Sequence, residues 1–240
     1  ISYDKGRNKL VREALKAGSL STIVDGLEHL GSTAFSLSVT ATEALRFAVD
    51  TNMTAGKLPA DPATVADATF PADYDQLSKE EQKGYRLKAS QVRKLKRSLT
   101  TDRIVLGRTL DVANMIEPYG AFYLPHNLDW RGRVYPVPSF SHHRADYVRG
   151  LFQFAEGFPL GKHGQAHLFA HTANCASGSA HGKLDKKTID ERIDWVWENR
   201  ELFWEIRENW KSRPELWPQT DNPFAFLAAS VEVANFIDHI

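Results

Sequence analysis

The feature that most restricts the fold of this chain is a long stretch without proline, residues 78–116. Glu, Lys, Gln, Arg and Leu predominate in it, and all five are good helix formers. A proline inside a helix would remove a hydrogen bond and clash with the preceding turn. We therefore expect one long helix over residues 78–116, which Thr100, Thr101 and Gly107 could break or bend.

The same stretch carries a very uneven charge. The chain has 30 basic and 30 acidic residues, so its formal net charge is zero. Between residues 83 and 108, however, nine basic residues accompany one acid, Asp102, which gives 9 − 1 = +8, and the rest of the chain must sum to −8. The neutral total therefore does not exclude a nucleic-acid partner.

At 100° per residue, six of these basic residues fall within an arc of about 100° on an unbroken helix: Lys83, Arg86, Arg93, Lys94, Arg97 and Arg108. We call these six the basic stripe. Four apolar residues fall on the opposite side: Tyr85, Val92, Leu95 and Leu99. The pattern favours a helix that packs on the protein with one face and follows a phosphate backbone with the other. A merely solvated helix face explains the pattern equally well.

A second candidate site follows Pro118. Apolar residues at 121–124 and 134–137 flank a polar connection and predict a small β-hairpin. The connection combines cations, a carboxylate, a glycine and aromatic neighbours: Asp129, Trp130, Arg131, Gly132, Arg133 and Tyr135. Guanidinium groups give forked, charge-assisted hydrogen bonds to phosphate, and glycine permits close approach of a backbone. Asp129 could orient one arginine. A hairpin held by an Asp–Arg pair, with no ligand, is the alternative.

The N-terminal third predicts further helices. Residues 10–30 contain short apolar groups ended by glycines, which favours two short helices. Residues 32–50 have near-helical apolar spacing, and residues 58–74 hold three prolines and predict a surface connection.

Helices are also expected from residue 162 onward. Thr188 and Glu191 have the spacing of a capping box, ahead of an apolar series that we expect in the core: Ile193, Val196, Phe203, Ile206 and Trp210. Asn222 and Pro223 fit an N-cap followed by proline at the first helical position of a last helix. The fold class is therefore mainly α with a small β-hairpin or sheet (α+β).

Composition narrows the class of protein. The chain is 42% hydrophobic and 25% charged, as globular proteins are. No apolar run approaches the roughly 20 residues that span a bilayer, so no membrane partner is expected. Cys175 is the single cysteine and cannot form an internal disulfide. The first residue is Ile, and the last residues lie within a predicted helix, so a piece of a longer protein is expected.

Other chemistry has weaker support. His163, His167 and His171 recur at i, i+4 spacing, but no convincing fourth ligand or zincin glutamate accompanies them, so no metal site is predicted. No serine, cysteine or carboxylate stands in a recognisable hydrolase setting. A hydrolase is thus a weak alternative, behind a nucleic-acid-binding module that is complete in itself.

The residues of the hairpin also carry a resemblance. Residues 124–135 read LPHNLDWRGRVY and resemble the D-x-x-G-R segment of single-subunit, phage- and mitochondrial-type DNA-directed RNA polymerases, with Asp129, Gly132 and Arg133 at its fixed positions. The resemblance continues through ordered blocks that begin at Arg149, Phe154, Pro159, His171, Asp221 and Glu232. It covers about residues 83–240, whereas the first eighty residues match nothing diagnostic.

The resemblance implies part of a right-hand polymerase fold. Residues 1–31 would end an N-terminal region, residues 32–117 would form a thumb-like helical region with the basic helix, and residues 118–240 would begin the palm. In this family the thumb helix lies against the template and the RNA:DNA hybrid. Lys83, Arg86, Arg93, Lys94 and Arg97 would then contact nucleic acid.

The resemblance also assigns roles within the D-x-x-G-R loop. Arg133 would be the leading phosphate contact, Asp129 would order the loop, and Gly132 would permit backbone approach. Arg131 and Tyr135 would be secondary contacts on the template side.

The chemistry implied by the family is RNA synthesis from ribonucleoside triphosphates on a DNA template, with two Mg²⁺ ions held by aspartates. Those aspartates are not expected in this chain, so no catalytic or metal-binding residue is assigned, and the piece alone is expected to be inactive. The parent enzyme would be a monomer in the cytoplasm of a phage-infected bacterium, or alternatively in the mitochondrial matrix or a plastid.

Overall fold

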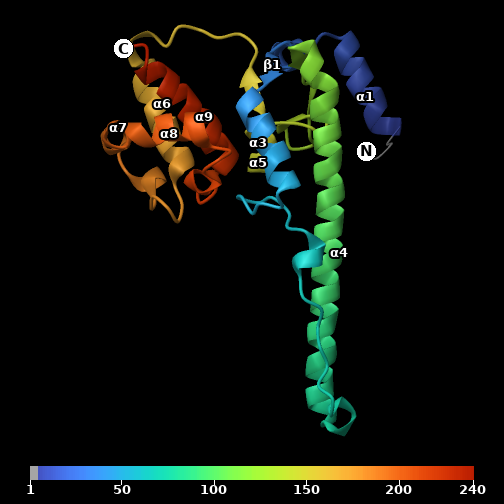
Figure 1. Ribbon diagram of the computed structural model, residues 1–240. Helices are drawn as coiled ribbons and strands as arrows, with labels where there is room; N and C mark the ends of the chain where they lie inside the picture. Colours follow the sequence, from blue (N-terminus) through green and yellow to red (C-terminus); the bar gives the residue numbers. More distant parts are fainter. Residues whose placement is uncertain (1–4) are drawn as a thin grey trace.

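The structure is a computed structural model that describes residues 5–240. Residues 1–4, where the predicted N-terminal region begins, lie outside the described residues. A single long helix, α4 (Lys79–Ile116), dominates the shape. Its C-terminal half packs beside the body of the molecule, and its N-terminal half projects well beyond that body (Figure 1). The predicted mainly helical fold with a small β part is confirmed.

The long helix begins where the sequence predicts it. The Ser78 hydroxyl accepts a hydrogen bond from the Glu81 amide (3.3 Å), and the Glu81 carboxylate accepts one from the Ser78 amide (2.9 Å), which forms a capping box. Thr100 and Thr101 do not break the helix. Their hydroxyls donate to the carbonyl oxygens of Lys96 and Arg97, one turn earlier, and leave the helical hydrogen bonds intact.

Two short helices, α1 (Lys5–Lys16) and α2 (Ser21–Gly31), precede α4 as predicted. The prediction of one helix over residues 32–50 is wrong at its start, because that segment begins with strand β1 (Ala34–Leu37) and only then forms α3 (Val39–Asp50). Strand β1 exists because it pairs with two distant strands, which local sequence spacing does not reveal.

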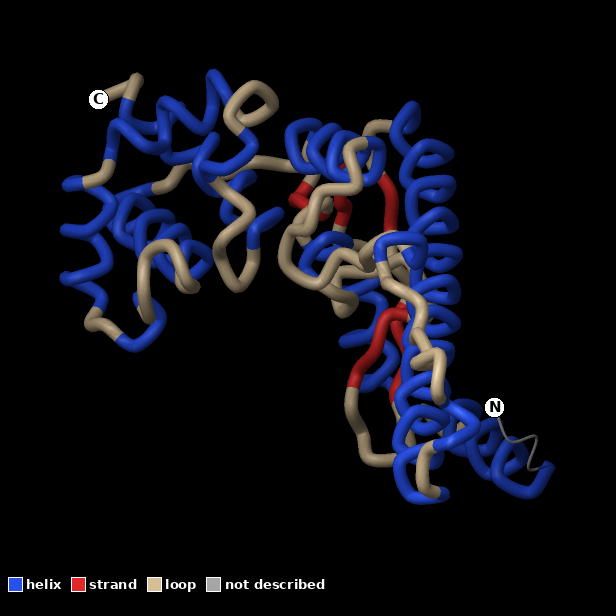
Figure 2. Tube along the Cα trace, turned by 60° about the horizontal axis from the view of Figure 1, so that its bottom comes forward, coloured by secondary structure: helices blue, strands red, loops and turns tan. Residues whose placement is uncertain are grey.

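The strands form two small antiparallel sheets. Strand β1 lies between β2 (Phe122–Tyr123) and β5 (Phe152–Phe154), and a separate pair joins β3 (His126–Leu128) to β4 (Val134–Pro136). Figure 2 shows these strands beside α4. The predicted hairpin is therefore real, but its first strand is β3 and not residues 121–124. Phe122 instead packs its ring near Phe35 and Phe152, within the other sheet.

The remaining chain is helical: α5 (Asp146–Arg149), α6 (Gly161–Ala176), α7 (Ile189–Glu198), α8 (Arg200–Asn209) and α9 (Pro223–Ile237). Short 3-10 turns join these and earlier elements at Pro62–Thr64, Tyr74–Gln76, Glu117–Tyr119, Leu184–Lys186 and Pro214–Leu216. The capping box at Thr188 and Glu191 is confirmed. Pro223 starts α9 as predicted, but Asn222 gives it no side-chain cap.

One hydrophobic core runs through the molecule. It joins buried residues of α3, α4, α5, α6, α7, α8 and α9, and the predicted core residues Val196, Phe203 and Ile206 are fully buried in it. The pairing of β1 with β2 and β5 crosses residue 118, where the sequence places a domain boundary. The division at residues 31 and 117 stays a prediction. Within residues 5–240, no helix has both the length and the apolar character that a membrane crossing requires.

Candidate nucleic-acid interface

The six residues of the basic stripe are all solvent-exposed on α4. In the part of the chain that the structure describes, none of them forms an ion pair with an acid. At a rise of 1.5 Å per residue, Lys83 and Arg108 are separated by about 38 Å along the helix axis. The stripe is therefore a long row of exposed cations that form no ion pair with any described carboxylate.

The opposite face of α4 packs on the preceding connection, which runs down beside the projecting half of the helix (Figure 1). Lys96 lies on this face and pairs with Asp67, with 2.6 Å between Nζ and Oδ1. The ring of Tyr85 packs against Phe70 and Tyr74. The predicted division of the helix into a packed and a cationic face is thus observed, except that Leu95 is 49% exposed.

The loop between β3 and β4 is organised by Asp129. One carboxylate oxygen, Oδ1, accepts hydrogen bonds from the amides of Arg131 (2.8 Å) and Arg133 (3.0 Å). The other, Oδ2, accepts two from the Arg131 guanidinium, at 2.9 and 2.8 Å. The expected ordering of the loop by Asp129 therefore agrees with the geometry, and the arginine that it orients is Arg131.

The charge of Asp129 is favoured by these contacts. Loss of hydration raises the pKa of this carboxyl, but the hydrogen bonds from the Arg133 amide, the Arg131 guanidinium and the Arg131 amide outweigh it and hold the pKa below its ordinary value. The loop therefore carries an ionised acid that neutralises Arg131 and leaves Arg133 as the uncompensated cation.

Gly132 has a backbone reason to be glycine. Its φ is +79°, and its amide donates to the carbonyl oxygen of Asp129 (3.1 Å). A turn followed by a left-handed residue is the usual geometry of a three-residue hairpin loop. A Cβ at Gly132 would meet nothing within 4 Å, so the space in front of the loop is open to another molecule.

The other loop residues differ in exposure. The guanidinium of Arg131 lies 5.5 Å from the centroid of the Trp130 ring, which is 78% exposed. Tyr135 lies on β4, is 38% exposed, and packs edge-on against His143. Arg133 is exposed and forms no ion pair with a described residue. Of the two loop arginines, Arg133 is thus the one free to bind a ligand.

The structure does not place all predicted site residues in one cluster. The stripe from Lys83 to Arg97 lies on the projecting half of α4, whereas the β3–β4 loop is part of the body (Figures 1 and 2). Sequence reasoning missed Arg144, which lines the same cavity as Arg108 but from the opposite side. No spacing signal links two residues 36 positions apart on a helix and a loop.

The histidines of α6 do not form a metal centre. Among residues 5–240, no group of three or more His, Cys, Asp or Glu side chains could hold a metal ion. His171 instead lies 3.6 Å from the Cys175 sulfur, and burial, followed by the charge of Arg149, lowers the pKa of His171.

Comparison with known proteins identifies the family. The family model described as DNA-dependent RNA polymerase matches residues 158–239. T7 RNA polymerase of Escherichia phage T7 is 36% identical over 70% of this chain and 18% of its own length. A mitochondrial DNA-directed RNA polymerase of Neurospora crassa is 31% identical over 92% of this chain and 15% of its own length. The chain belongs to the single-subunit RNA polymerase family.

The likeness extends to plant members of this family. DNA-directed RNA polymerase 2, chloroplastic/mitochondrial, of Arabidopsis thaliana is 29% identical over 94% of this chain and 22% of its own length. The chain thus spans about a fifth of the length of the curated polymerases it matches. Phage and organellar members are both among its relatives, as expected from the D-x-x-G-R resemblance.

Proposed function

We propose that this chain is part of a DNA-directed RNA polymerase and that it binds the DNA template and the RNA:DNA hybrid. The family membership supports the polymerase assignment. The single observation that carries the binding assignment is the basic stripe: six exposed cations on one face of α4, unpaired within the described residues, while Lys96 on the other face pairs with Asp67. In the polymerase, α4 would be the thumb-like helix.

The β3–β4 loop would supply a second contact. Arg133 would bind a backbone phosphate, because its guanidinium is exposed and the competing carboxylate of Asp129 is already engaged by Arg131. Gly132 would let the strand approach, since the space in front of it is open. Arg131 and Tyr135 would be secondary contacts.

The binding proposal is tested by the salt dependence of hybrid binding. A fluorescent RNA:DNA hybrid is titrated with this chain at several salt concentrations, and the slope of log K against log salt reports the phosphates neutralised. Replacing Arg93, Lys94 and Arg97 together by Gln is expected to reduce that slope by about two to three units. Lys96→Gln is the control for position, because it removes one positive charge from the packed face of the same helix and should leave the slope nearly unchanged. An unaltered slope for the triple variant would mean that the stripe is only solvated.

The polymerase proposal needs the product of the full gene. RNA synthesis on a primed template, with and without Mg²⁺, is expected from that product and not from this chain alone. The residues described here offer no carboxylate cluster that fits a magnesium pair, so we derive no catalytic step from them. A full gene product that binds hybrid but makes no RNA would instead indicate a nucleic-acid-binding module without enzymatic activity.

A further inference from the structure

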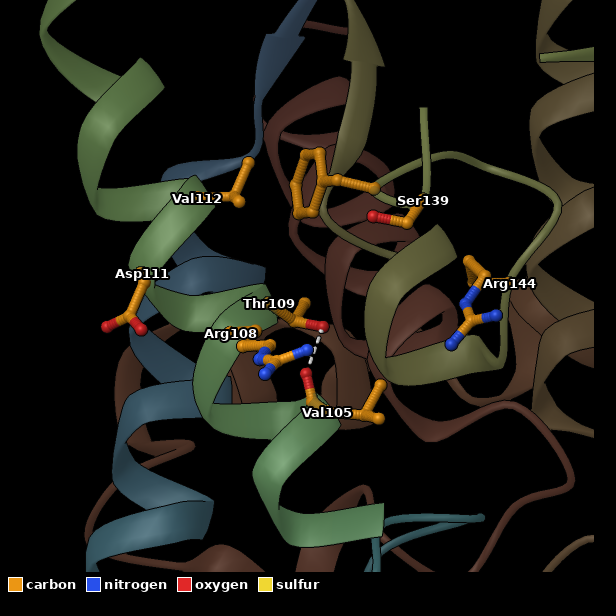
Figure 3. A pocket seen from close by; sticks show the side chains of 8 residues that line it. Val105, Arg108, Thr109, Asp111, Val112, Ser139 and Arg144 are labelled. Atoms are coloured by element: carbon orange, nitrogen blue, oxygen red, sulfur yellow. Dashed lines mark hydrogen bonds between the residues drawn. The ribbon is translucent and has the colours of Figure 1, made fainter. Parts of the chain in front are cut away.

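A cavity of about 440 Å³ lies where the C-terminal half of α4 meets the loop that follows β4. Arg108 and Thr109 line it from α4, and Ser139 and Arg144 line it from the loop (Figure 3). Its volume falls within the ~300–1,000 Å³ typical of small-ligand sites. Two parts of the chain that are distant in sequence thus enclose one concave site with a cation on each side.

We propose that this cavity, the Arg108–Arg144 cavity, binds a phosphate group of the nucleic-acid strand that follows the basic stripe. The inference rests on the proposed function, because Arg108 is the last residue of the stripe. From Arg97 to Arg108 the helix rises about 16 Å, which corresponds to about five nucleotide steps of ~3.4 Å. A strand that lies along the stripe can therefore reach the cavity without leaving α4.

The charges of the cavity favour an anion. Arg46, Arg131, Arg207 and Arg213 each form an ion pair with a described acid. Within residues 5–240, Arg108 and Arg144 form no ion pair with a carboxylate. Asp111 is the one carboxylate in the lining of this cavity, and its side chain points away from the loop (Figure 3). The lining therefore holds two guanidinium groups and one carboxylate, which is a net positive charge, although Arg144 also borders a neighbouring cavity that Asp102 lines.

The walls of the cavity would strengthen such a contact. Val105, Val112 and Phe140 line it, and Phe140 is only 7% exposed. Both arginines are solvent-exposed, so a phosphate can reach them from solvent, and the apolar walls displace part of its water and strengthen the arginine–phosphate pair relative to a flat surface. The planar guanidinium also supports two parallel hydrogen bonds to phosphate oxygens. The Thr109 hydroxyl already donates to the carbonyl oxygen of Val105 (2.9 Å), so Ser139 supplies the available hydroxyl donor.

The experiment is the hybrid titration described above, with Arg144→Gln as the decisive variant. Because Arg144 lies outside the stripe, its loss is expected to reduce the salt slope by about one unit only if the cavity holds a phosphate. Arg108→Gln is expected to do the same. Asp111→Asn is expected to tighten binding, because it removes a repulsive charge. Arg200→Gln, an equal change of charge on the distant helix α8, is the control and should leave the slope unchanged.

A second arm distinguishes a strand phosphate from a free nucleotide phosphate. Binding of ATP alone is measured with the same variants. If Arg144→Gln lowers the salt slope of hybrid binding and leaves ATP binding unchanged, the cavity holds a backbone phosphate. If the variant weakens ATP binding and leaves the salt slope of hybrid binding unchanged, the cavity holds the phosphate of a free nucleotide. If Arg144→Gln changes neither while the triple stripe variant still lowers the slope, the cavity inference is wrong and the proposed function stands. If the unaltered chain does not bind hybrid, both fail.

Discussion

The carboxylate of Asp146 accepts a hydrogen bond from the backbone amide of Phe224, with 2.9 Å between Oδ2 and the nitrogen. The first turn of α9 is therefore capped by a residue of α5 that lies 78 positions earlier in the chain. Asn222, which occupies the N-cap position, instead accepts a hydrogen bond from Arg149 (2.7 Å). Asp146 and Arg149 together fix α5 on the start of α9.

Loss of this cap should destabilise the fold. Asp146 is 6% exposed, so Asp146→Ala leaves a buried amide without its acceptor and is expected to lower the free energy of unfolding by about 1–2 kcal/mol. Denaturant unfolding of the variant and the parent chain measures this difference. Asp73→Ala is the control, because Asp73 is exposed and makes no side-chain cap bond. Equal losses in the two variants would contradict the role of Asp146.

The stability of the chain should also depend on pH through Asp146. Burial raises the pKa of this carboxyl, and the amide of Phe224, the charge of Arg149 and the amide of Ala225 only partly oppose it. A raised folded-state pKa gives a stabilising contribution that is complete below the unfolded pKa and is lost as the pH rises through the folded pKa. The stability of the parent chain relative to Asp146→Asn should therefore increase as the pH falls from 7 to 4. A difference that does not vary with pH would refute this.

Two glycines should respond to alanine in opposite directions. A Cβ at Gly150 would lie 2.8 Å from the Cβ of Phe224 and 3.0 Å from the amide nitrogen of Ala225. Neither atom can move freely, so Gly150→Ala should cost about 1–3 kcal/mol. Gly107 lies inside α4 with nothing within 4 Å of an added Cβ, so Gly107→Ala should stabilise the chain by up to ~1 kcal/mol. Thermal unfolding midpoints of the two variants test both signs.

The order of the β3–β4 loop should depend on the charge of Asp129. Asp129→Ala removes the acceptor of four hydrogen bonds, so the Arg133 amide should exchange its hydrogen several-fold faster than in the parent chain. Because the pKa of Asp129 is lowered, the stabilisation is present above the unfolded pKa and is lost only as the pH falls through the folded value. If the Arg133 amide instead loses its protection against hydrogen exchange at a pH above the unfolded pKa of Asp129, the lowered pKa of Asp129 is contradicted.

Arg133→Ala should impair RNA synthesis by the full gene product without unfolding it. The side chain is exposed and makes no ion pair with a described residue, so under the proposed function its removal takes away a phosphate contact, while core packing stays unchanged. Elongation or initiation on a primed template is the readout, and the thermal unfolding midpoint is the control for folding. RNA synthesis at the unaltered rate would remove Arg133 from the interface.

Cys175 should be unreactive in the folded chain. Burial, assisted by the nearby charge of Asp146, raises the pKa of this thiol to about 12, so almost no thiolate exists at pH 8. A thiol reagent should label it slowly in the native state and rapidly in denaturant. Rapid native labelling at pH 8 would show that the site is more open than the structure indicates.

Much of this protein was predictable from local sequence. Residues 78–116 lack proline and are rich in helix formers, and the capping box at Thr188 and Glu191 satisfies its own helix end, so both helices follow from short-range hydrogen bonding. The cationic face of α4 follows from the helical period alone. The D-x-x-G-R loop is local too, because Asp129 bonds residues only two and four positions away.

Tertiary structure decided what depends on distant partners. Residues 34–37 form a strand because β2 and β5 supply its hydrogen bonds. Residues 122–123 belong to that sheet, so the first strand of the hairpin is β3, which pairs with β4. The cap of α9 comes from Asp146, and the Arg108–Arg144 cavity exists only because a loop folds back onto α4. Helical periodicity predicts which face of one segment is buried. Strand pairing and the lining of a cavity depend on which distant segment packs against that face, and the local sequence does not determine that segment.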